Sequence, residues 1–305
     1  MSGIVRCVAY LFLIVVGLFV TADAFHALSI WWRNRRWERT VTRDANGILT
    51  NAAPHTLDGT SDAAILFIHG FADTPETWQL LAPRVHGLTN VTCRVMRLPY
   101  ISVPLRLQHH ATLDNWLDAI RDEVARLRAC HNKVFIAGHS LGAGLALLAT
   151  RQTPGIADGV IVLAPLIRVP RRWGVSLDRL FNVVSPVLPF TRALHNHFPA
   201  VIKTKDGRVY DYKRDRFIAL EIYRALFKMT RLLTAHGDVR PPKNVLAFLS
   251  LRDRVIDVPA ALRYLEGAQI ITTNEAGHVL TLDVGWEKRA EQIAEFVKTN
   301  KEPLP

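Results

Sequence analysis

The sequence predicts an α/β fold in which a mostly parallel central sheet is flanked by helices. Short continuous apolar runs, such as residues 63–68 and 159–164, are typical of strands buried on both faces of a parallel sheet. Segments with apolar residues at helical spacing, such as residues 114–127, lie between these runs. Because strands that alternate with helices pair in parallel through right-handed crossovers, we expect this class of fold.

The composition is that of a globular protein with a large core. The chain has 305 residues, 49% of them hydrophobic, which is enough for one large domain or two small ones. Cys7, Cys93 and Cys130 form neither a disulfide framework nor a metal-ligand spacing. Because nucleotide-binding and zinc-binding motifs are also absent from the sequence, we expect no metal and no cofactor.

The N-terminal segment has the character of a membrane span. Residues 7–22 are apolar and uncharged, a length at the short end for a helix that crosses a bilayer. The apolar character resumes at residues 27–32, where a pair of tryptophans suits the membrane interface. We therefore expect residues 1–32 to form a single transmembrane anchor, and residues 33–62 to form a polar connector with one early strand near residues 37–42.

Two interpretations of this segment give opposite locations for the rest of the chain. Four arginines follow the apolar run: Arg33, Arg35, Arg36 and Arg39. For a membrane anchor, the positive-inside rule would keep the downstream domain in the cytoplasm. Alternatively, Ala22-Asp23-Ala24 fits a signal-peptidase site, and the chain would be exported after cleavage. Because arginines so soon after a cleavage site hinder export, we favour the anchor.

The core of the fold is expected in two parts, residues 63–165 and 244–300. In the first part, strands are predicted at residues 63–68, 91–98, 134–137 and 159–164, and helices at residues 75–88, 114–127 and 141–149. The second part resumes the pattern with strands near residues 244–250 and 269–273 and helices near residues 259–265 and 286–297.

Residues 166–243 interrupt the pattern and are predicted to form an inserted, basic helical cap. They hold 16 Lys or Arg and six Asp or Glu, and so account for most of the net charge of +11. Their apolar residues form two stripes at helical spacing, one of Trp173, Leu177, Leu180, Phe181, Val184 and Leu188, the other of Ile218, Ile222, Leu226, Met229 and Leu233. Because such stripes suit a lid or a lipid surface, we expect the basic cap to contact the membrane and not nucleic acid.

The most specific motif is the strand-turn-helix at residues 133–149. An apolar strand is followed by Gly138-His139-Ser140-Leu141-Gly142 and then by a helical run, which is a nucleophile elbow. The two glycines are needed because side chains would collide across the sharp turn, which leaves the hydroxyl of Ser140 exposed above the sheet. The N–H of Leu141, at the start of the helix, points to where an oxyanion would form.

A serine hydroxyl needs a base at neutral pH, and the base needs an orienting carboxylate. In folds with this elbow, the acid and then the histidine follow the serine along the chain, in loops after late strands. Asp253 lies at the apex of such a loop, whereas Asp257 precedes Val258-Pro259 and is expected to cap the next helix. His278 follows the last strand, so Ser140, Asp253 and His278 are the predicted catalytic residues.

Other residues near these loops have supporting roles. His139 is next to Ser140 on the elbow and points elsewhere, so it is not expected to be the base. His69 ends a strand and is expected to shape the loop that follows. This loop should supply the second oxyanion donor, for which the N–H of Phe71 is the candidate beside that of Leu141.

Four sequence pieces resemble the α/β-hydrolase superfamily over roughly residues 60–300, and the bacterial carboxylesterase and monoacylglycerol-lipase-like group within it. They are His69-Gly70-Phe71 with Pro75 and Trp78, the elbow at residues 138–142, Asp253-Arg254-Val255-Ile256, and Gly277-His278-Val279-Leu280-Thr281-Leu282-Asp283. The resemblance implies hydrolysis of carboxylic esters through an acyl-serine intermediate. It also implies a small ester or lipid-like substrate, no cofactor, and a helical lid at residues 166–243.

The sequence departs from this group in one loop. Members often carry Gly-His-Gly where this chain has Pro99-Tyr100-Ile101-Ser102-Val103-Pro104, so the border of the substrate pocket differs. The soluble members also have no counterpart of the N-terminal apolar segment. A serine peptidase or an acyltransferase of the same fold would use the same three residues, and a non-catalytic, membrane-tethered binding protein is a further alternative.

Overall fold

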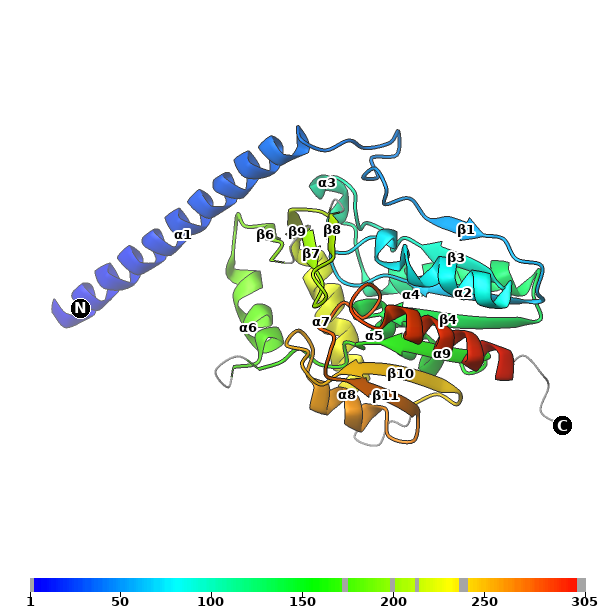
Figure 1. Ribbon diagram of the computed structural model, residues 1–305. Helices are drawn as coiled ribbons and strands as arrows, with labels where there is room; N and C mark the ends of the chain where they lie inside the picture. Colours follow the sequence, from blue (N-terminus) through cyan, green and yellow to red (C-terminus); the bar gives the residue numbers. More distant parts are fainter. Residues whose placement is uncertain (1–2, 172–174, 198–200, 212–213, 236–240, 301–305) are drawn as a thin grey trace.

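The fold is built on a seven-stranded sheet in the order β1-β3-β2-β4-β5-β10-β11. In this computed structural model, which describes residues 3–171, 175–197, 201–211, 214–235 and 241–300, every neighbouring pair of strands is parallel except β1 and β3 (Figure 1). The predicted mostly parallel sheet is therefore confirmed. Its strands are β1 (His55–Leu57), β2 (Ala63–Ile68), β3 (Thr92–Met96), β4 (Lys133–His139), β5 (Gly159–Leu163), β10 (Val245–Ser250) and β11 (Gln269–Thr273).

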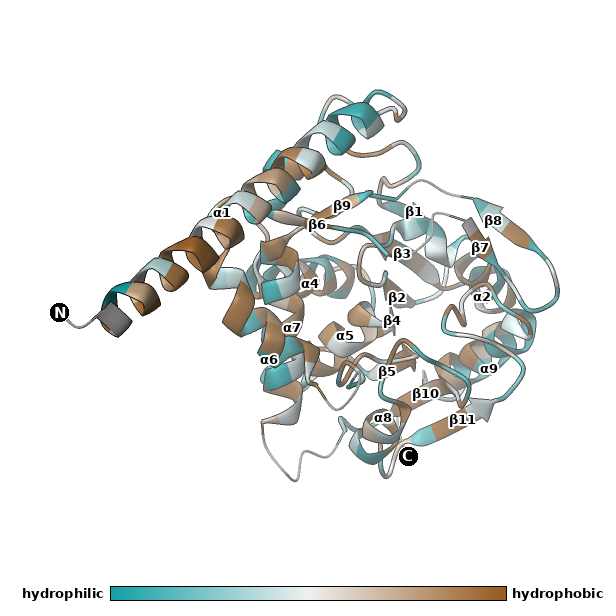
Figure 2. Cartoon of the chain, turned by 90° about the vertical axis from the view of Figure 1, so that its left-hand side faces the viewer, coloured by the Kyte–Doolittle hydropathy of each residue, from teal (hydrophilic) through white to brown (hydrophobic). Residues whose placement is uncertain are grey.

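Helices cover both faces of the sheet. Helices α2 and α9 pack together on one face, and α4, α5 and α7 pack together on the other (Figure 2). The helices and 3-10 turns of the core are η1 (Pro75–Trp78), α2 (Leu81–Thr89), α3 (Leu105–Gln108), α4 (Leu113–Arg128), α5 (Leu141–Gln152), α8 (Val258–Tyr264) and α9 (Trp286–Thr299). Thr74 caps η1 and Asp257 caps α8 through their side chains, as expected for Ser, Thr and Asp before a helix.

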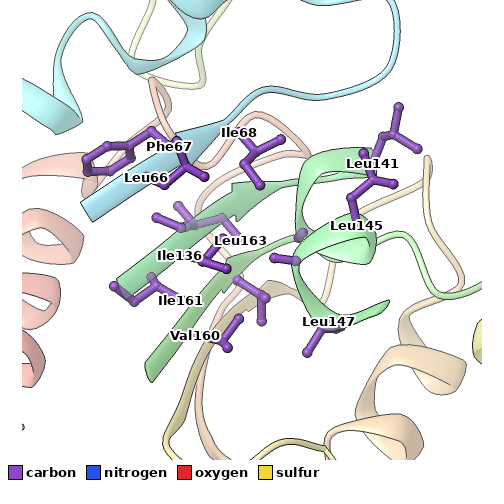
Figure 3. Close-up of a cluster of buried hydrophobic side chains, with 14 of the residues drawn as sticks. Leu66, Phe67, Ile68, Ile136, Leu141, Leu145, Leu147, Val160, Ile161 and Leu163 are labelled. Atoms are coloured by element: carbon purple, nitrogen blue, oxygen red, sulfur yellow. The ribbon is translucent and has the colours of Figure 1, made fainter. Parts of the chain in front are cut away.

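The core lies between the central strands and these helices. Apolar side chains from β2, β4 and β5 meet those of α5 in one continuous cluster (Figure 3). Every residue of β2 and β5 is buried, which explains why these strands are continuous apolar runs and do not alternate.

Residues 166–243, the predicted cap, are only partly helical, and this segment is called the cap below. Two helices, α6 (Leu177–Val184) and α7 (Leu220–Thr234), contain most of the two predicted apolar stripes. Leu188 of the first stripe follows α6, Ile218 of the second lies in a strand before α7, and Trp173 of the first falls outside the described residues. Two short antiparallel strand pairs and a 3-10 turn complete the described part: β6 (Ala193–His195) with β9 (Phe217–Ala219), β7 (Val201–Lys203) with β8 (Val209–Asp211), and η2 (Ser185–Val187). Strands of three residues are too short to show an alternating pattern, so the sequence did not predict them.

The N-terminal helix is longer than its apolar run. Helix α1 spans Gly3–Glu38 and is a candidate membrane span by length and composition. The prediction of a strand near residues 37–42 is wrong. Helix α1 continues through the arginine-rich segment, and the first strand of the sheet is β1. Helices extend readily once nucleated, since each added residue gains a backbone hydrogen bond. The connector at residues 33–62 is therefore helical at its start.

The turn from β4 to α5 has the close packing that the elbow motif predicts. Ser140 has a φ of 53° and a ψ of −112°, in the left-handed half of the backbone map. A Cβ added to Gly138 would lie 2.4 Å from the backbone of Gly142, and one added to Gly142 would lie 2.3 Å from the carbonyl oxygen of Ile68. Neither position accepts a side chain without moving the sheet.

We predict that Gly142→Ala lowers the free energy of unfolding by about 2–3 kcal/mol, because the new methyl group overlaps the backbone of β2. Gly87→Ala is the matched control, since Gly87 lies in α2 with no atom within 4 Å of its added Cβ. This control is expected to raise stability by about 0.5–1 kcal/mol. Urea unfolding of the full chain in detergent micelles measures both free energies. Equal stability of the two variants would show that Gly142 has room for a methyl group.

Candidate active site

Three side chains from distant parts of the sequence form a continuous hydrogen-bonded chain. The Oγ of Ser140 lies 3.1 Å from Nε2 of His278, and Nδ1 of His278 lies 2.7 Å from Oδ2 of Asp253. The carboxylate can only accept, so Nδ1 carries the proton and Nε2 presents its lone pair to the serine hydroxyl. The structure thus brings together the three residues that the sequence singled out.

The parallel sheet explains why these residues meet. Ser140 follows β4, Asp253 follows β10 and His278 follows β11, so all three lie at the carboxyl edge of the sheet, where the loops of α/β folds gather (Figure 1). The backbone of Ser140 is fixed by an N–H bond to Leu163 and by two amides that donate to its carbonyl. Its hydroxyl therefore has a defined position relative to His278.

The acid is buried and fully hydrogen-bonded. The side chain of Asp253 has no exposed surface, and its Oδ1 accepts from the amides of Val255 and Ile256. Burial alone would raise the pKa of this carboxyl, but the hydrogen bonds from His278 and the two amides outweigh it and hold the pKa below its usual range. Asp253 is therefore charged at neutral pH. The other acid candidate, Asp257, caps α8 and binds Arg168.

His139 supports His278 and does not contact the serine hydroxyl. Its ring lies 5.1 Å from that of His278, and its Nε2 donates to the backbone carbonyl of His278 at 3.1 Å. Burial, with a smaller contribution from His278, lowers the pKa of His139 to about 4, so its ring is neutral at neutral pH. The expectation that His139 is not the base agrees with this geometry.

The loop after β2 passes directly over the serine. A Cβ added to Gly70 would lie only 3.4 Å from the Cβ of Ser140. Phe71, the candidate oxyanion donor, is the next residue after this close approach. His69 fixes the loop, because its Nδ1 donates to Gly70 and its Nε2 accepts from the amide of Leu98. Leu141 is the first residue of α5, and the first N–H groups of a helix have no partner within it.

The cap covers this loop through two contacts that the sequence analysis did not anticipate. The ring of Tyr223, on α7, packs 5.0 Å from the ring of Phe71. Arg214, in the cap, binds the carboxylate of Asp73 at 2.9 Å, and both side chains are almost completely buried. Burial alone would raise the pKa of Asp73, but the Arg214 guanidinium, the two nearby histidines and the amide of Thr74 together outweigh burial and lower that pKa. No local motif marks such a pair, because its partners are far apart in sequence.

The altered loop at residues 99–104 is also tied to the cap. The amide of Ser102 donates to Oδ2 of Asp215 at 2.8 Å, and Arg43 binds the other oxygen of the same carboxylate. Cap and core are thus joined at several buried positions. Within the described ranges, no group of three or more His, Cys, Asp or Glu side chains has the arrangement of a metal site.

Solved structures of lipases and esterases share this architecture. A chain from the study of the metagenome-derived lipolytic enzymes LipS and LipT superposes with a TM-score of 0.69 at 18% identity, covering 83% of this chain and 99% of its own. The monoacylglycerol lipase of Paleococcus ferrophilus gives 0.66 at 16% identity, covering 81% and 98%. A soluble variant of the Saccharomyces cerevisiae monoglyceride lipase gives 0.65 at 12% identity, covering 81% and 92%.

At these identities, the superpositions establish the fold. No curated protein sequence matches the chain. The sequence model of the alpha/beta hydrolase family matches residues 65–296, which include both parts of the core and the cap between them. The chain therefore belongs to the alpha/beta hydrolase family.

Proposed function

We propose that this protein is a membrane-anchored serine hydrolase that cleaves carboxylic esters, including lipid-like esters, through an acyl-serine intermediate. The observation that carries the proposal is the hydrogen-bonded chain from Ser140 through His278 to the buried, charged Asp253. The fold of known lipases and esterases supports the same class of reaction.

The first half of the reaction acylates the serine. His278 takes the proton from Ser140 as the serine oxygen attacks the ester carbonyl, and Asp253 stabilises the resulting imidazolium. The N–H groups of Leu141 and Phe71 are the proposed donors to the oxyanion. His278 then protonates the departing alcohol as the bond between the carbonyl carbon and the alcohol oxygen breaks.

The second half releases the acid. His278 takes a proton from water, the resulting hydroxide attacks the acyl carbonyl, and the proton returns to the oxygen of Ser140 as the acid leaves. None of these steps needs a cofactor, since the chain's own side chains move every proton.

The cap favours an apolar acyl group. Tyr223, Phe181 and Phe227 form an aromatic cluster on the cap side of Phe71, with ring separations of 5.0–5.8 Å. Two of the structural relatives are named as monoacylglycerol or monoglyceride lipases. We therefore propose a lipid-like ester as the substrate class.

Contacts between α1 and the cap support retention of the N-terminal helix as an anchor. The carboxylate of Asp23 accepts from the amides of Phe190 and Thr191, and His26 bonds to the hydroxyl of Thr191. Cleavage at Ala22-Asp23-Ala24 would remove part of this contact, which a signal peptide has no need to make. The exposed arginines that follow the apolar run favour a cytoplasmic catalytic domain under the positive-inside rule.

A serine peptidase or an acyltransferase would use the same side chains. A peptidase would require the cap to admit an extended peptide, and an acyltransferase would require exclusion of water from the acyl-enzyme. The aromatic cluster beside Phe71 offers apolar surface and not a sheet edge for peptide binding, so we rank ester hydrolysis first.

We predict that the full chain hydrolyses p-nitrophenyl esters and that Ser140→Ala lowers kcat by about 10⁵-fold, because the nucleophile is lost. Asp253→Asn should lower kcat by about 10⁴-fold, since the amide favours the wrong tautomer of His278. Asp257→Asn is the matched control and should keep kcat within about twofold, because Asp257 caps α8 and binds Arg168 but does not contact His278. The measurement is initial rates on chain lengths from C2 to C16.

Turnover that survives in Ser140→Ala would contradict the assignment of the nucleophile. A folded wild-type chain with no turnover on any ester would favour peptidase, acyltransferase or binding-protein function.

We further predict that His139 positions His278 through its donated hydrogen bond. His139→Leu removes the donor and should lower kcat about tenfold, the equivalent of one hydrogen bond of about 1.4 kcal/mol, while KM changes less than twofold. His139→Gln keeps an N–H donor on a side chain of similar reach and should restore most of kcat. A KM effect with unchanged kcat, or equal losses in both variants, would show that His139 has only a packing role.

A further inference from the structure

We propose that residues 175–190 form a second contact with the lipid bilayer, beside the membrane-spanning part of α1. We refer to the exposed apolar side chains of this segment as the α6–η2 surface: Val175, Leu180, Val183, Val184, Val187 and Phe190. The inference rests on the proposed retention of α1 as an anchor, and it adds a surface that the fold and the active site do not require.

Helix α6 packs too loosely to belong to the core. None of its eight residues is buried, and Val183 is 72% exposed. Its contact with the rest of the cap includes Phe181, which packs on Tyr223 and Phe227 of α7. The six side chains of the α6–η2 surface are exposed and apolar, and Arg179 and Asn182 are exposed beside them. Figure 2 accordingly shows both hydrophobic and hydrophilic residues on α6. A helix with one exposed apolar face is the kind of element that lies in the bilayer interface.

The anchor fixes this surface at the level where α1 leaves the membrane. Asp23 accepts hydrogen bonds from the amides of Phe190 and Thr191, at the end of the segment. His26 and Ile30 continue the contact with Thr191 and with the β6–β9 pair. Figure 1 shows the result: the N-terminal half of α1 projects away from the body on the side where α6 lies.

The length of α1 places the membrane boundary at the same point. The uncharged run of residues 7–22 rises about 24 Å at 1.5 Å per residue, at the short end for a hydrocarbon core of about 30 Å, and Arg6 precedes it. Asp23 is the first acidic residue after this stretch, and its carboxylate is held by the cap. The amides of Phe190 and Thr191 that bind it must therefore also lie at the bilayer surface.

The bilayer is the occupant that these observations favour over a second copy of the chain. The α6–η2 surface ends at Phe190, whose amide binds Asp23, and Asp23 directly follows the exposed apolar stretch of α1 that faces lipid if α1 spans a membrane. Arg179 and Arg192 are exposed on and beside the segment, where phosphate headgroups would meet them.

This contact gives lipid-like substrates a short route to the serine. Phe181 of α6 packs on Tyr223, and Tyr223 packs on Phe71 of the loop above Ser140. A bilayer contact at α6 would therefore bring the part of the cap that packs on the loop above Ser140 next to the lipid.

Depth-dependent quenching tests the contact directly. In the full chain with Cys7→Ser and Cys130→Ser, a fluorescent dye is attached to Val183→Cys or, as the matched control, to Val209→Cys, which is exposed on β8. Cys93 can stay, because its thiol is buried. In vesicles of phosphatidylcholine alone, lipids that carry a quencher on the acyl chain should quench the dye at 183 at least threefold more than the dye at 209.

Equal quenching at the two positions would overturn the proposal. A dye at 183 that is shielded from water but not quenched by the lipid would also overturn it, and would indicate a second copy of the chain at this surface. The quenching measurement requires no catalysis. It therefore tests the membrane contact even if the protein proves to have no esterase activity.

A rate comparison supplies the functional readout. The combined variant Leu180→Ser, Val183→Ser and Val187→Ser should lower the ratio of turnover on a long-chain ester in vesicles to turnover on soluble p-nitrophenyl acetate about tenfold. Val209→Ser should leave that ratio unchanged. An unchanged ratio in the combined variant would contradict a role of the α6–η2 surface in substrate delivery.

Discussion

The structure depends on the close approach of two backbones at the turn between β4 and α5. Gly138 and Gly142 have no room for a side chain, and Gly142 lies against the end of β2. This packing holds Ser140 in its left-handed conformation and at the carboxyl edge of the sheet. The acid and histidine loops reach the same edge because β10 and β11 run parallel to β4. The hydrogen-bonded chain to Asp253 follows from that placement.

Much of this arrangement could be predicted from the sequence, because it is encoded locally. Buried parallel strands are continuous apolar runs, and a glycine-flanked serine between strand and helix is typical of a nucleophile elbow. Asp253 was separated from Asp257 by its place at the loop apex, and the structure shows Asp257 capping α8 as expected. The sequence was therefore enough to predict the sheet, its helices and the contact between Ser140 and His278.

The features that the sequence did not reveal depend on pairs of distant residues. The buried pair of Arg214 and Asp73 leaves no periodic signal, and the three-residue strands of the cap are shorter than any pattern that indicates a strand. Helix α1 was predicted only as far as its apolar run. Its contact with the cap through Asp23 forms only when the chain is folded, yet this contact connects the membrane segment to the part of the protein that covers the serine.

We propose that His278 and Asp253 make Ser140 the nucleophile of this protein. Treatment of the full chain with a fluorophosphonate, followed by mass spectrometry of its peptides, tests that claim without knowledge of the substrate. We expect one phosphonyl adduct, located on Ser140, and none in a folded His278→Ala variant. An adduct on another serine, or no adduct on the folded wild-type chain, would contradict it.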